Sequence, residues 1–186
     1  MTATRTSILH VFWISLLLLL LSTAPAKATL LTLPDGSPAP LVYQGWVDAA
    51  YVPTPPGEVT VSLDGCPGDV PLPSCAPENQ HRIELDPQYA DRHVVLHELG
   101  HVFDDLMPEW VRPRFRAMVA PRKRGQWSAA NGRAPLNEQF AEAYALCATK
   151  LSLRGRSYGN YGYNPSPRLH RKVCALINAA GAGFGE

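Results

Sequence analysis

The clearest hydrophobic pattern in the chain lies between residues 94 and 106, where apolar side chains recur every three or four positions. This spacing places them along one face of an α-helix, and it predicts an amphipathic helix with that face toward a core. The helix is expected to begin near Pro87 or Asp91 and to end before Pro108, because proline cannot continue a helix. Its apolar positions are Val95, Leu96, Leu99, Val102, Phe103 and Leu106.

Three further stretches of the C-terminal half have helical character. Residues 109–120 favour a short helix that Pro113 interrupts early, and residues 136–153 favour a long amphipathic helix that Gly155 stops. A last helix is expected over residues 167–180, before a glycine-rich end of the kind that frays.

Strand patterns precede these helices. Residues 81–85 alternate polar and apolar side chains, as a half-buried strand does, whereas residues 29–60 favour turns and short strands at 41–43 and 58–61. The prolines within residues 64–77 exclude regular structure and favour a disulfide-closed Ω-type loop. Two roles remain open for the strand at 81–85: the edge of a cleft, to which an extended peptide is added, or a structural strand without substrate contact.

The N-terminus reads as a secretory signal peptide over residues 1–28, with cleavage after Ala28. Arg5 is followed by an apolar run from residue 8 to residue 21 and by the small-x-small sequence Ala26-Lys27-Ala28. The apolar run is shorter than the roughly 20 residues that span a bilayer. We therefore expect a secreted protein with one domain over residues 29–186 and no stable membrane insertion after cleavage, with an uncleaved signal anchor as the alternative.

The net charge gives no reason to expect a nucleic acid as partner. Removal of residues 1–28 takes away Arg5 and Lys27, which leaves 17 − 2 = 15 Lys and Arg against 16 Asp and Glu. Basic residues do cluster locally, and they indicate a solvated face or loop, or less favourably a contact with an anionic partner. The cluster comprises Arg112, Arg114, Arg116, Arg122, Lys123 and Arg124.

The four cysteines all follow the signal peptide, and an even number in a secreted chain indicates two disulfides. Of the three possible pairings we favour Cys66–Cys75, which closes the proline-rich loop, and Cys147–Cys174, which joins two predicted helices. A cysteine-ligated metal is the competing interpretation, and the absence of any C-x-x-C pair disfavours it.

The predicted helix over 94–106 contains the sequence His97-Glu98-Leu99-Gly100-His101. His97 and His101 lie one turn apart on the same face, so both imidazoles can bind one Zn²⁺. Glu98 is rotated by about 100° from His97 and can approach a zinc-bound water rather than the metal. The alternative is a helix with two surface histidines and a solvated glutamate.

A catalytic zinc takes three protein ligands and keeps one position for water, so this motif lacks one ligand. Glu138, in the helix predicted downstream, is the best candidate, and Glu142 lies four residues on, where it can accept a hydrogen bond from a ligating histidine. Alternatively, both glutamates are solvent-facing charges on an amphipathic helix. His93 shares the helical row of the motif histidines and is either an outer partner of the site or a partly buried polar residue.

These residues resemble the gluzincin branch of the zincin metallopeptidases. In that branch a glutamate on a later helix is the third ligand and an acidic residue four positions on supports a zinc histidine, which corresponds to Glu138 and Glu142. Asp104 and Met107 stand where the metzincin branch requires glycine and histidine. Locally, residues 97–105 and 138–143 are similar to the catalytic domain of anthrax lethal factor. The resemblance implies an α+β fold, with a small, twisted, mostly antiparallel sheet packed on the motif helix and C-terminal helices that carry the third ligand.

The resemblance also implies a group that stabilises the oxyanion, for which Tyr158, Tyr161, Tyr163 and His170 are candidates. The alternative is that the tyrosines only pack a loop. The expected activity is hydrolysis of peptide bonds by a water that one Zn²⁺ per chain activates, with Glu98 as the base and a peptide or protein as substrate. Hydrolysis of a cell-wall or other non-protein amide, and a toxin-like binding module that keeps the fold, are the alternatives; the intact Glu98 argues against the second.

Overall fold

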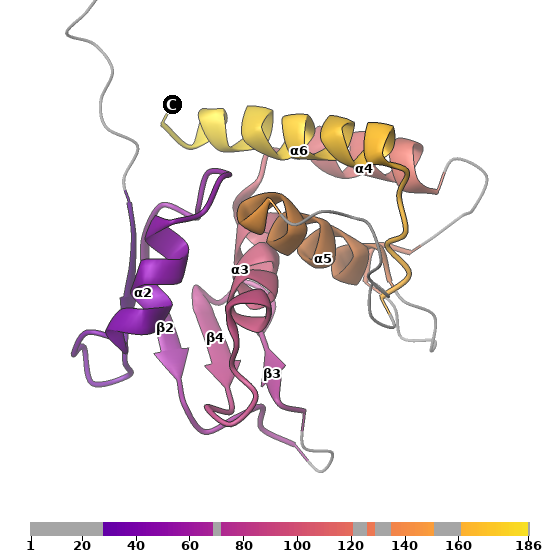
Figure 1. Ribbon diagram of the computed structural model, residues 1–186. Coiled ribbons are helices and arrows are strands. Elements are labelled where there is room, and N and C mark those ends of the chain that lie inside the picture. Colours follow the sequence, from indigo (N-terminus) through magenta and orange to yellow (C-terminus); the bar gives the residue numbers. More distant parts are fainter. Residues whose placement is uncertain (1–27, 69–71, 121–125, 129–134, 151–160, 186) are drawn as a thin grey trace, which may run out of the picture.

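The computed structural model describes residues 28–68, 72–120, 126–128, 135–150 and 161–185. Predictions that concern residues 1–27, Arg122–Arg124, residues 151–153 and Tyr158 lie outside the described residues. In chain order the elements are β1 (Thr29–Thr32), α2 (Leu41–Asp48), β2 (Gly57–Ser62), β3 (Ser74–Cys75), β4 (Arg82–Leu85), α3 (Arg92–Leu106), α4 (Val111–Val119), α5 (Leu136–Thr149), α6 (Pro167–Gly181) and a 3₁₀ turn at Ala182–Gly185 (Figure 1).

The described residues form an α+β fold around a four-stranded sheet of order β1-β2-β4-β3. β1 pairs with β2 and β2 with β4 in parallel, and only the β3–β4 pair is antiparallel. The prediction of a mostly antiparallel sheet is therefore wrong. Parallel neighbours need a long return connection, which helix α2 supplies between β1 and β2 and residues 63–81 supply between β2 and β4.

Helix α2 occupies residues for which the sequence indicated a strand at 41–43. Tyr43 and Val47, four residues apart, are buried on one face of this helix, which explains why helical packing overrides the local strand preference. Gln44 ties the helix to β1: its side-chain oxygen accepts from the backbone N–H of Leu31, and its amide nitrogen donates to the carbonyl of Thr29.

The strand at 81–85 is present as β4, but it lies between β2 and β3 and is not an edge. The edge beside the motif helix is β3, within the loop for which no regular structure was predicted. The Cys66–Cys75 disulfide and the hydrogen bond from Cys66 N–H to the Leu72 carbonyl fold this loop back, so that Ser74 and Cys75 pair with β4.

Helix α3 has the limits that the sequence predicts. The side chain of Asp91 caps its N-terminus by accepting from Val94 N–H, and the helix ends at Leu106, ahead of Pro108. It packs closely on α5 at Gly100, where an added Cβ would lie 2.9 Å from Cα of Ala141. Glycine is therefore required for this approach, and the approach brings the polar groups of α3 and α5 together.

The remaining helices cover the other side of α5. α4 and α6 contact each other and lie across one end of the molecule (Figure 1). Pro113 falls in the first turn of α4, where proline is tolerated. α5 ends at Thr149, because Lys150 adopts a left-handed conformation, so the predicted helix does not continue through Lys150.

Both predicted disulfides, Cys66–Cys75 and Cys147–Cys174, are present, and the second joins α5 to α6. Such bonds are typical of proteins in oxidising, extracytoplasmic compartments. No helix among the described residues is long and apolar enough to cross a membrane.

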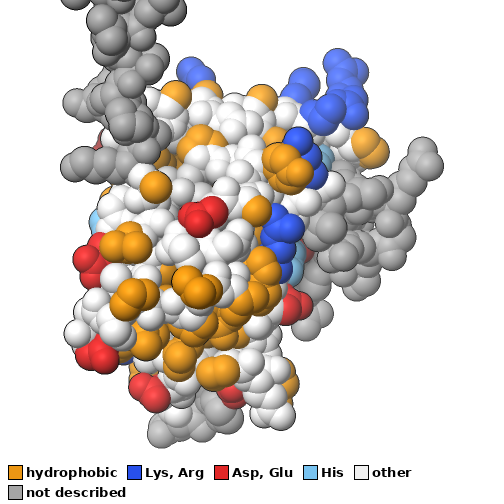
Figure 2. Space-filling view, turned by 60° about the vertical axis from the view of Figure 1, so that its left-hand side comes forward, with side chains coloured by type: hydrophobic (Ala, Val, Ile, Leu, Met, Phe, Trp, Pro, Cys, Tyr) orange, Lys and Arg blue, Asp and Glu red, His pale blue; other side chains and the backbone are white. Residues whose placement is uncertain are grey.

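Apolar side chains are exposed on β1 and at the start of α2, among them Leu30, Leu41 and Val42. Figure 2 brings this side of the molecule forward and shows apolar groups gathered over its lower part.

Candidate metal centre

Helices α3 and α5 bring two histidines and one glutamate together. Nε2 of His97 lies 3.2 Å from one carboxylate oxygen of Glu138, and Nε2 of His101 lies 3.4 Å from the other. One donor atom from each of the three residues lies within 4.8 Å of the other two. The three side chains that the sequence selects as metal ligands therefore converge on one point and could hold a metal ion.

A second group lies on the opposite side of the His97 ring. Nε2 of His93 lies 2.8 Å from Oε2 of Glu142, and the same oxygen lies 3.5 Å from Nδ1 of His97. His93, His97 and Glu142 could also hold a metal ion. The two groups share His97 but use different ring nitrogens: Nδ1 lies nearest to Glu142, while Nε2 faces Glu138.

The two glutamates make the site favourable for positive charge. Burial disfavours the charged form of His97, but hydrogen bonds to Glu138 and Glu142 and the nearby charge of Glu98 outweigh it and raise the pKa of His97 to about 9. Burial likewise opposes ionisation of Glu138 and Glu142, yet their histidine partners lower the pKa of each to about 2. The positive charge of protonated His97 thus stabilises both carboxylates. A divalent cation bound at Nε2 would take the place of the proton on that nitrogen.

Glu98 lies beside these groups without belonging to either of them. Glu98 is only 4% exposed, and burial raises the pKa of its carboxyl group. The charges of His97 and His101 oppose this shift. The hydroxyl of Ser74 on β3 hydrogen-bonds to this carboxyl group. A buried carboxylate with a raised pKa, fixed by a neighbour, is suited to accept a proton near neutral pH.

A cavity of about 550 Å³ opens onto the centre. β3 and the residues that follow it form one wall, α3 and the start of α5 form the other, and its size is that of pockets which hold small ligands or peptide side chains. Among the described residues its lining includes His97, Glu98, His101 and Glu138 but neither His93 nor Glu142. Only the first donor group is therefore open to a molecule in the cavity.

Of the described candidates for stabilising the oxyanion, one lies in the cavity and two do not. Tyr161 lines the cavity, and its ring centroid lies 4.6 Å from that of His97. Burial, and then the charges of Glu138 and Glu98, raise the pKa of its hydroxyl, which keeps it protonated. Tyr163 and His170 instead pair with each other at 3.0 Å and are absent from the described lining of the cavity, so neither is placed to act there.

One buried carboxylate beside the cavity is absent from the sequence-based set of candidates. Asp104 is 4% exposed and accepts hydrogen bonds from Nε1 of Trp127 at 2.7 Å and from Nε of Arg112 at 3.0 Å. Burial raises the pKa of Asp104, and the two donors oppose the shift. Arg112, predicted as part of a solvated basic face, therefore has a structural partner, and no pattern in the sequence indicated this pair.

Comparison with known proteins finds no relative: the chain matches no protein-family model, no curated protein and no solved structure.

Proposed function

We propose that the chain is a secreted zinc-dependent metallopeptidase of the gluzincin type. The observation that carries the proposal is the placement of the Glu138 carboxylate between the Nε2 atoms of His97 and His101, at 3.2 and 3.4 Å, at the wall of a cavity. Two imidazoles and one carboxylate with an open side are the donor set of catalytic zinc in peptidases.

The donor set fits zinc better than it fits Ca²⁺ or Mg²⁺, which prefer oxygen ligands. His97, His101 and Glu138 would hold the ion, and Zn²⁺ bound there would acidify a water and polarise the scissile carbonyl. The group of His93, His97 and Glu142 is the poorer choice, because His93 and Glu142 are absent from the described lining of the cavity. In this assignment Glu142 accepts the Nδ1 proton of His97 and fixes its tautomer.

Glu98 is the proposed general base. It lines the cavity next to both histidines, it is not part of either donor group, and burial raises its pKa above the ordinary value of a glutamate. It would take a proton from the attacking water and pass it to the leaving amine. Ser74 hydrogen-bonds to its carboxyl group and limits its rotation.

The cavity wall supports an extended substrate. β3 is an edge of the sheet, and Ser74 and Cys75 line the cavity, so a peptide added along this edge would pass the donor group. Tyr161 is the one described aromatic candidate in the lining, and its protonated hydroxyl is the proposed donor to the oxyanion.

The test is mass spectrometry of products from a mixed peptide library incubated with the zinc-loaded protein. Internal cleavage is expected, and it should stop with a chelator and in the Glu98→Gln variant. If the zinc-loaded protein leaves every peptide intact but hydrolyses cell-wall fragments, the substrate class is wrong; if it hydrolyses neither, the enzymatic proposal fails.

A further inference from the structure

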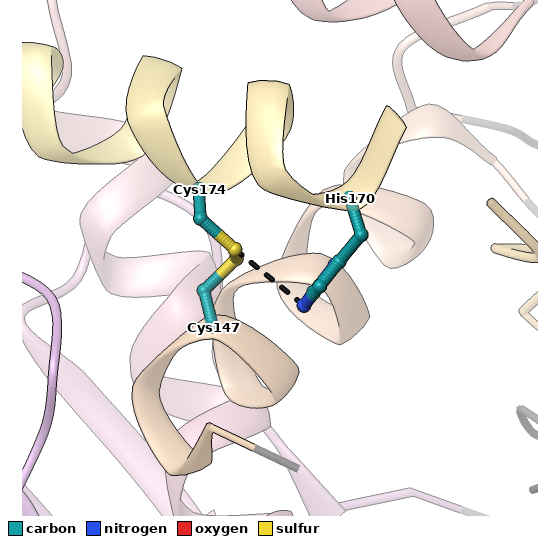
Figure 3. A group of neighbouring side chains, drawn as sticks. All are labelled: Cys147, His170 and Cys174. Carbon is teal, nitrogen blue, oxygen red and sulfur yellow. Dashed lines mark hydrogen bonds between the residues drawn. A yellow bond between two sulfur atoms is a disulfide. The ribbon is translucent and has the colours of Figure 1, made fainter. Parts of the chain in front are cut away.

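A third cluster of donor side chains lies at the junction of α5 and α6 (Figure 3). None of its three residues is in the described lining of the cavity. Cys147 comes from the last turn of α5, while His170 and Cys174 lie one turn apart on the same face of α6. Donor atoms of the three residues lie within 4.8 Å of one another. In this structure the two sulfur atoms are joined as a disulfide, so neither is a thiolate.

We propose that the dithiol form of this junction is a second metal site, in which Cys147, Cys174 and Nε2 of His170 bind a thiolate-preferring divalent ion such as Zn²⁺. Thiol–disulfide exchange with a disulfide oxidant, which takes up two electrons and two protons and becomes a dithiol, re-forms the Cys147–Cys174 bond and expels the ion. The site is distinct from the His97–His101–Glu138 group, and the proposal does not depend on the proposed peptidase activity.

The positions of the donors match the geometry of a tetrahedral zinc site. Zn–S and Zn–N bonds of about 2.3 and 2.0 Å at a tetrahedral angle place a sulfur and a nitrogen about 3.5 Å apart. Nε2 of His170 lies 3.5 Å from Sγ of Cys174. Cys147 already faces Cys174, with the two Cα atoms 5.5 Å apart, so rotation of the freed side chains can bring both sulfurs to one ion.

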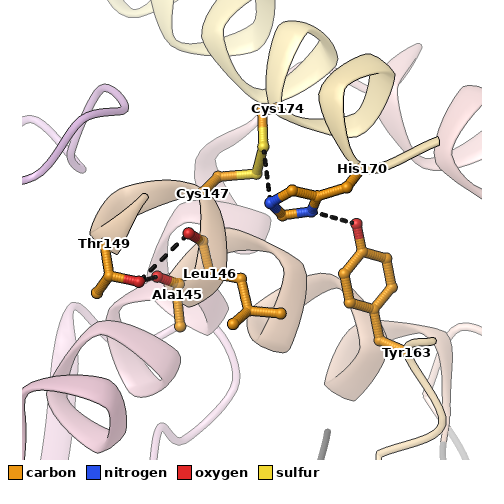
Figure 4. Close-up of a disulfide and its surroundings, with 7 residues drawn as sticks. All are labelled: Ala145, Leu146, Cys147, Thr149, Tyr163, His170 and Cys174. Carbon is orange, nitrogen blue, oxygen red and sulfur yellow. Dashed lines mark hydrogen bonds between the residues drawn. A yellow bond between two sulfur atoms is a disulfide. The ribbon is translucent and has the colours of Figure 1, made fainter. Parts of the chain in front are cut away.

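The imidazole of His170 is also held as a metal ligand would be. Its Nδ1 lies 3.0 Å from the hydroxyl of Tyr163, so in the dithiol form Nδ1–H can donate to that oxygen and leave the lone pair of Nε2 for the ion (Figure 4). Tyr163 is only 1% exposed, which fixes the partner in place.

The exchange is chemically balanced. A dithiol reductant supplies two electrons and two protons, the sulfur–sulfur bond of Cys147–Cys174 breaks, and the reductant becomes a disulfide. Binding of the ion then releases the two thiol protons. The chain before oxidation carries the same two thiols, so the metal-bound form would precede the disulfide.

The proposal is tested with a Cys66→Ala/Cys75→Ala chain, in which Cys147 and Cys174 are the remaining two of four cysteines. After reduction with a phosphine and removal of the phosphine, the chain is titrated with Co²⁺. A thiolate-to-cobalt charge-transfer band that grows to one equivalent is expected for the reduced chain and not for the oxidised chain. Co²⁺ bound by histidine and carboxylate alone gives no such band. Failure of metal binding at the cleft can therefore be told apart from failure at the Cys147–His170–Cys174 site.

Three variants sharpen the test. His170→Ala should weaken Co²⁺ binding at this site by at least about 10-fold, and Tyr163→Phe should weaken it by about 10-fold. His81→Ala, which removes an exposed histidine outside the cluster, is the matched control and should leave the band unchanged.

Folding of the reduced chain is followed by circular dichroism. If reduction unfolds the chain, Zn²⁺ should restore the helical signal and protect both thiols from alkylation. A reduced chain that shows no sulfur band at excess Co²⁺, or thiols that react equally fast with and without Zn²⁺, would overturn the proposal.

Discussion

Two clusters of donor side chains in this molecule have the same arrangement of donors along their helices, but different interactions hold the donors together. In each, one helix presents two donors four residues apart, His97 and His101 on α3 and His170 and Cys174 on α6, and α5 supplies the third. In the cluster on α3 and α5, non-covalent contacts join the Glu138 carboxylate to the two histidines, and the three residues could hold a metal ion. A covalent bond closes the cluster on α5 and α6 in this structure.

The difference shows how α5 can serve both clusters. Its first turn carries Glu138, and its last turn carries Cys147. The disulfide fixes the far end of the helix to α6, while the contact at Gly100 fixes its middle against α3. The carboxylates at the near end are therefore positioned by the packing of the helix and remain available for a ligand.

The largest effect is expected for Glu138→Ala, which removes the donor that α5 supplies to the His97–His101–Glu138 cluster. Tight zinc binding at the cleft should be abolished, because two histidines alone leave the ion short of its third protein ligand. Titration against a competing chelator measures the effect. A variant that still binds zinc as tightly as the unchanged protein would show that Glu138 is not a ligand.

Glu98→Gln should leave the donor group intact and remove the base. Zinc content is expected to stay at about one ion per cleft, while turnover of a cleaved peptide falls by roughly 10²–10⁴-fold. Elemental analysis and steady-state kinetics on one preparation give both values. Normal turnover in this variant would refute the assignment of the base.

Removal of the covalent cluster by Cys147→Ala/Cys174→Ala should reduce the free energy of unfolding by about 2–4 kcal/mol, since the bond restricts the unfolded chain. Zinc affinity at the cleft should fall as well, because α5 loses its anchor to α6. Denaturant unfolding and the chelator titration measure the two effects. Cys66→Ala/Cys75→Ala is the control, and a larger loss of affinity there would place the anchor on β3 instead.

Glu142→Ala should weaken zinc binding by about 10–100-fold without abolishing it, because it removes the acceptor for Nδ1–H of His97 and leaves all three ligands. His93→Ala, which frees Glu142 from its 2.8 Å partner, should have a smaller effect in the same direction. If Glu142→Ala loses the metal and Glu138→Ala keeps it, the ligand is Glu142.

The smallest expected effect is a shift in the pH dependence of stability. The pKa of His97 is raised to about 9, so its contribution is complete below its ordinary value of 6.5 and is lost as the pH rises through about 9. The pKa values of Glu138 and Glu142 are lowered to about 2, so their contributions are complete above 4.5 and are lost as the pH falls through about 2.

Metal-free protein should therefore be most stable between about pH 4.5 and 6.5, and zinc should move the maximum to higher pH, because the ion replaces the proton on His97. Thermal unfolding across pH 3–10, with and without zinc, checks this. In the Glu138→Ala variant, zinc should no longer move the pH of maximum stability.

Much of the centre could be predicted because its geometry is local. A spacing of four residues on a helix places His97 beside His101 whatever surrounds it. The strong apolar pattern also located α3, and the few cysteines made Cys147–Cys174 the simplest bond between two predicted helices.

The contacts that depend on distant partners could not be predicted in the same way. Three hydrogen bonds join residues far apart in the sequence, and no periodicity indicates them. They link Ser74 to Glu98, Trp127 to Asp104 and His93 to Glu142. The choice of Tyr161 over Tyr163 likewise depends on where the chain lies after α5.

The sequence was enough to predict helices α3 to α6, the pair of histidines, the neighbouring glutamate and the cysteine pairs, because each follows from short-range spacing or from a small number of candidates. Only the tertiary structure decided the parallel sheet, the helical state of α2, and the place of β3 at the edge. Strand pairing and burial depend on which distant segment supplies the partner, so the free energy of packing decides them and local preference does not.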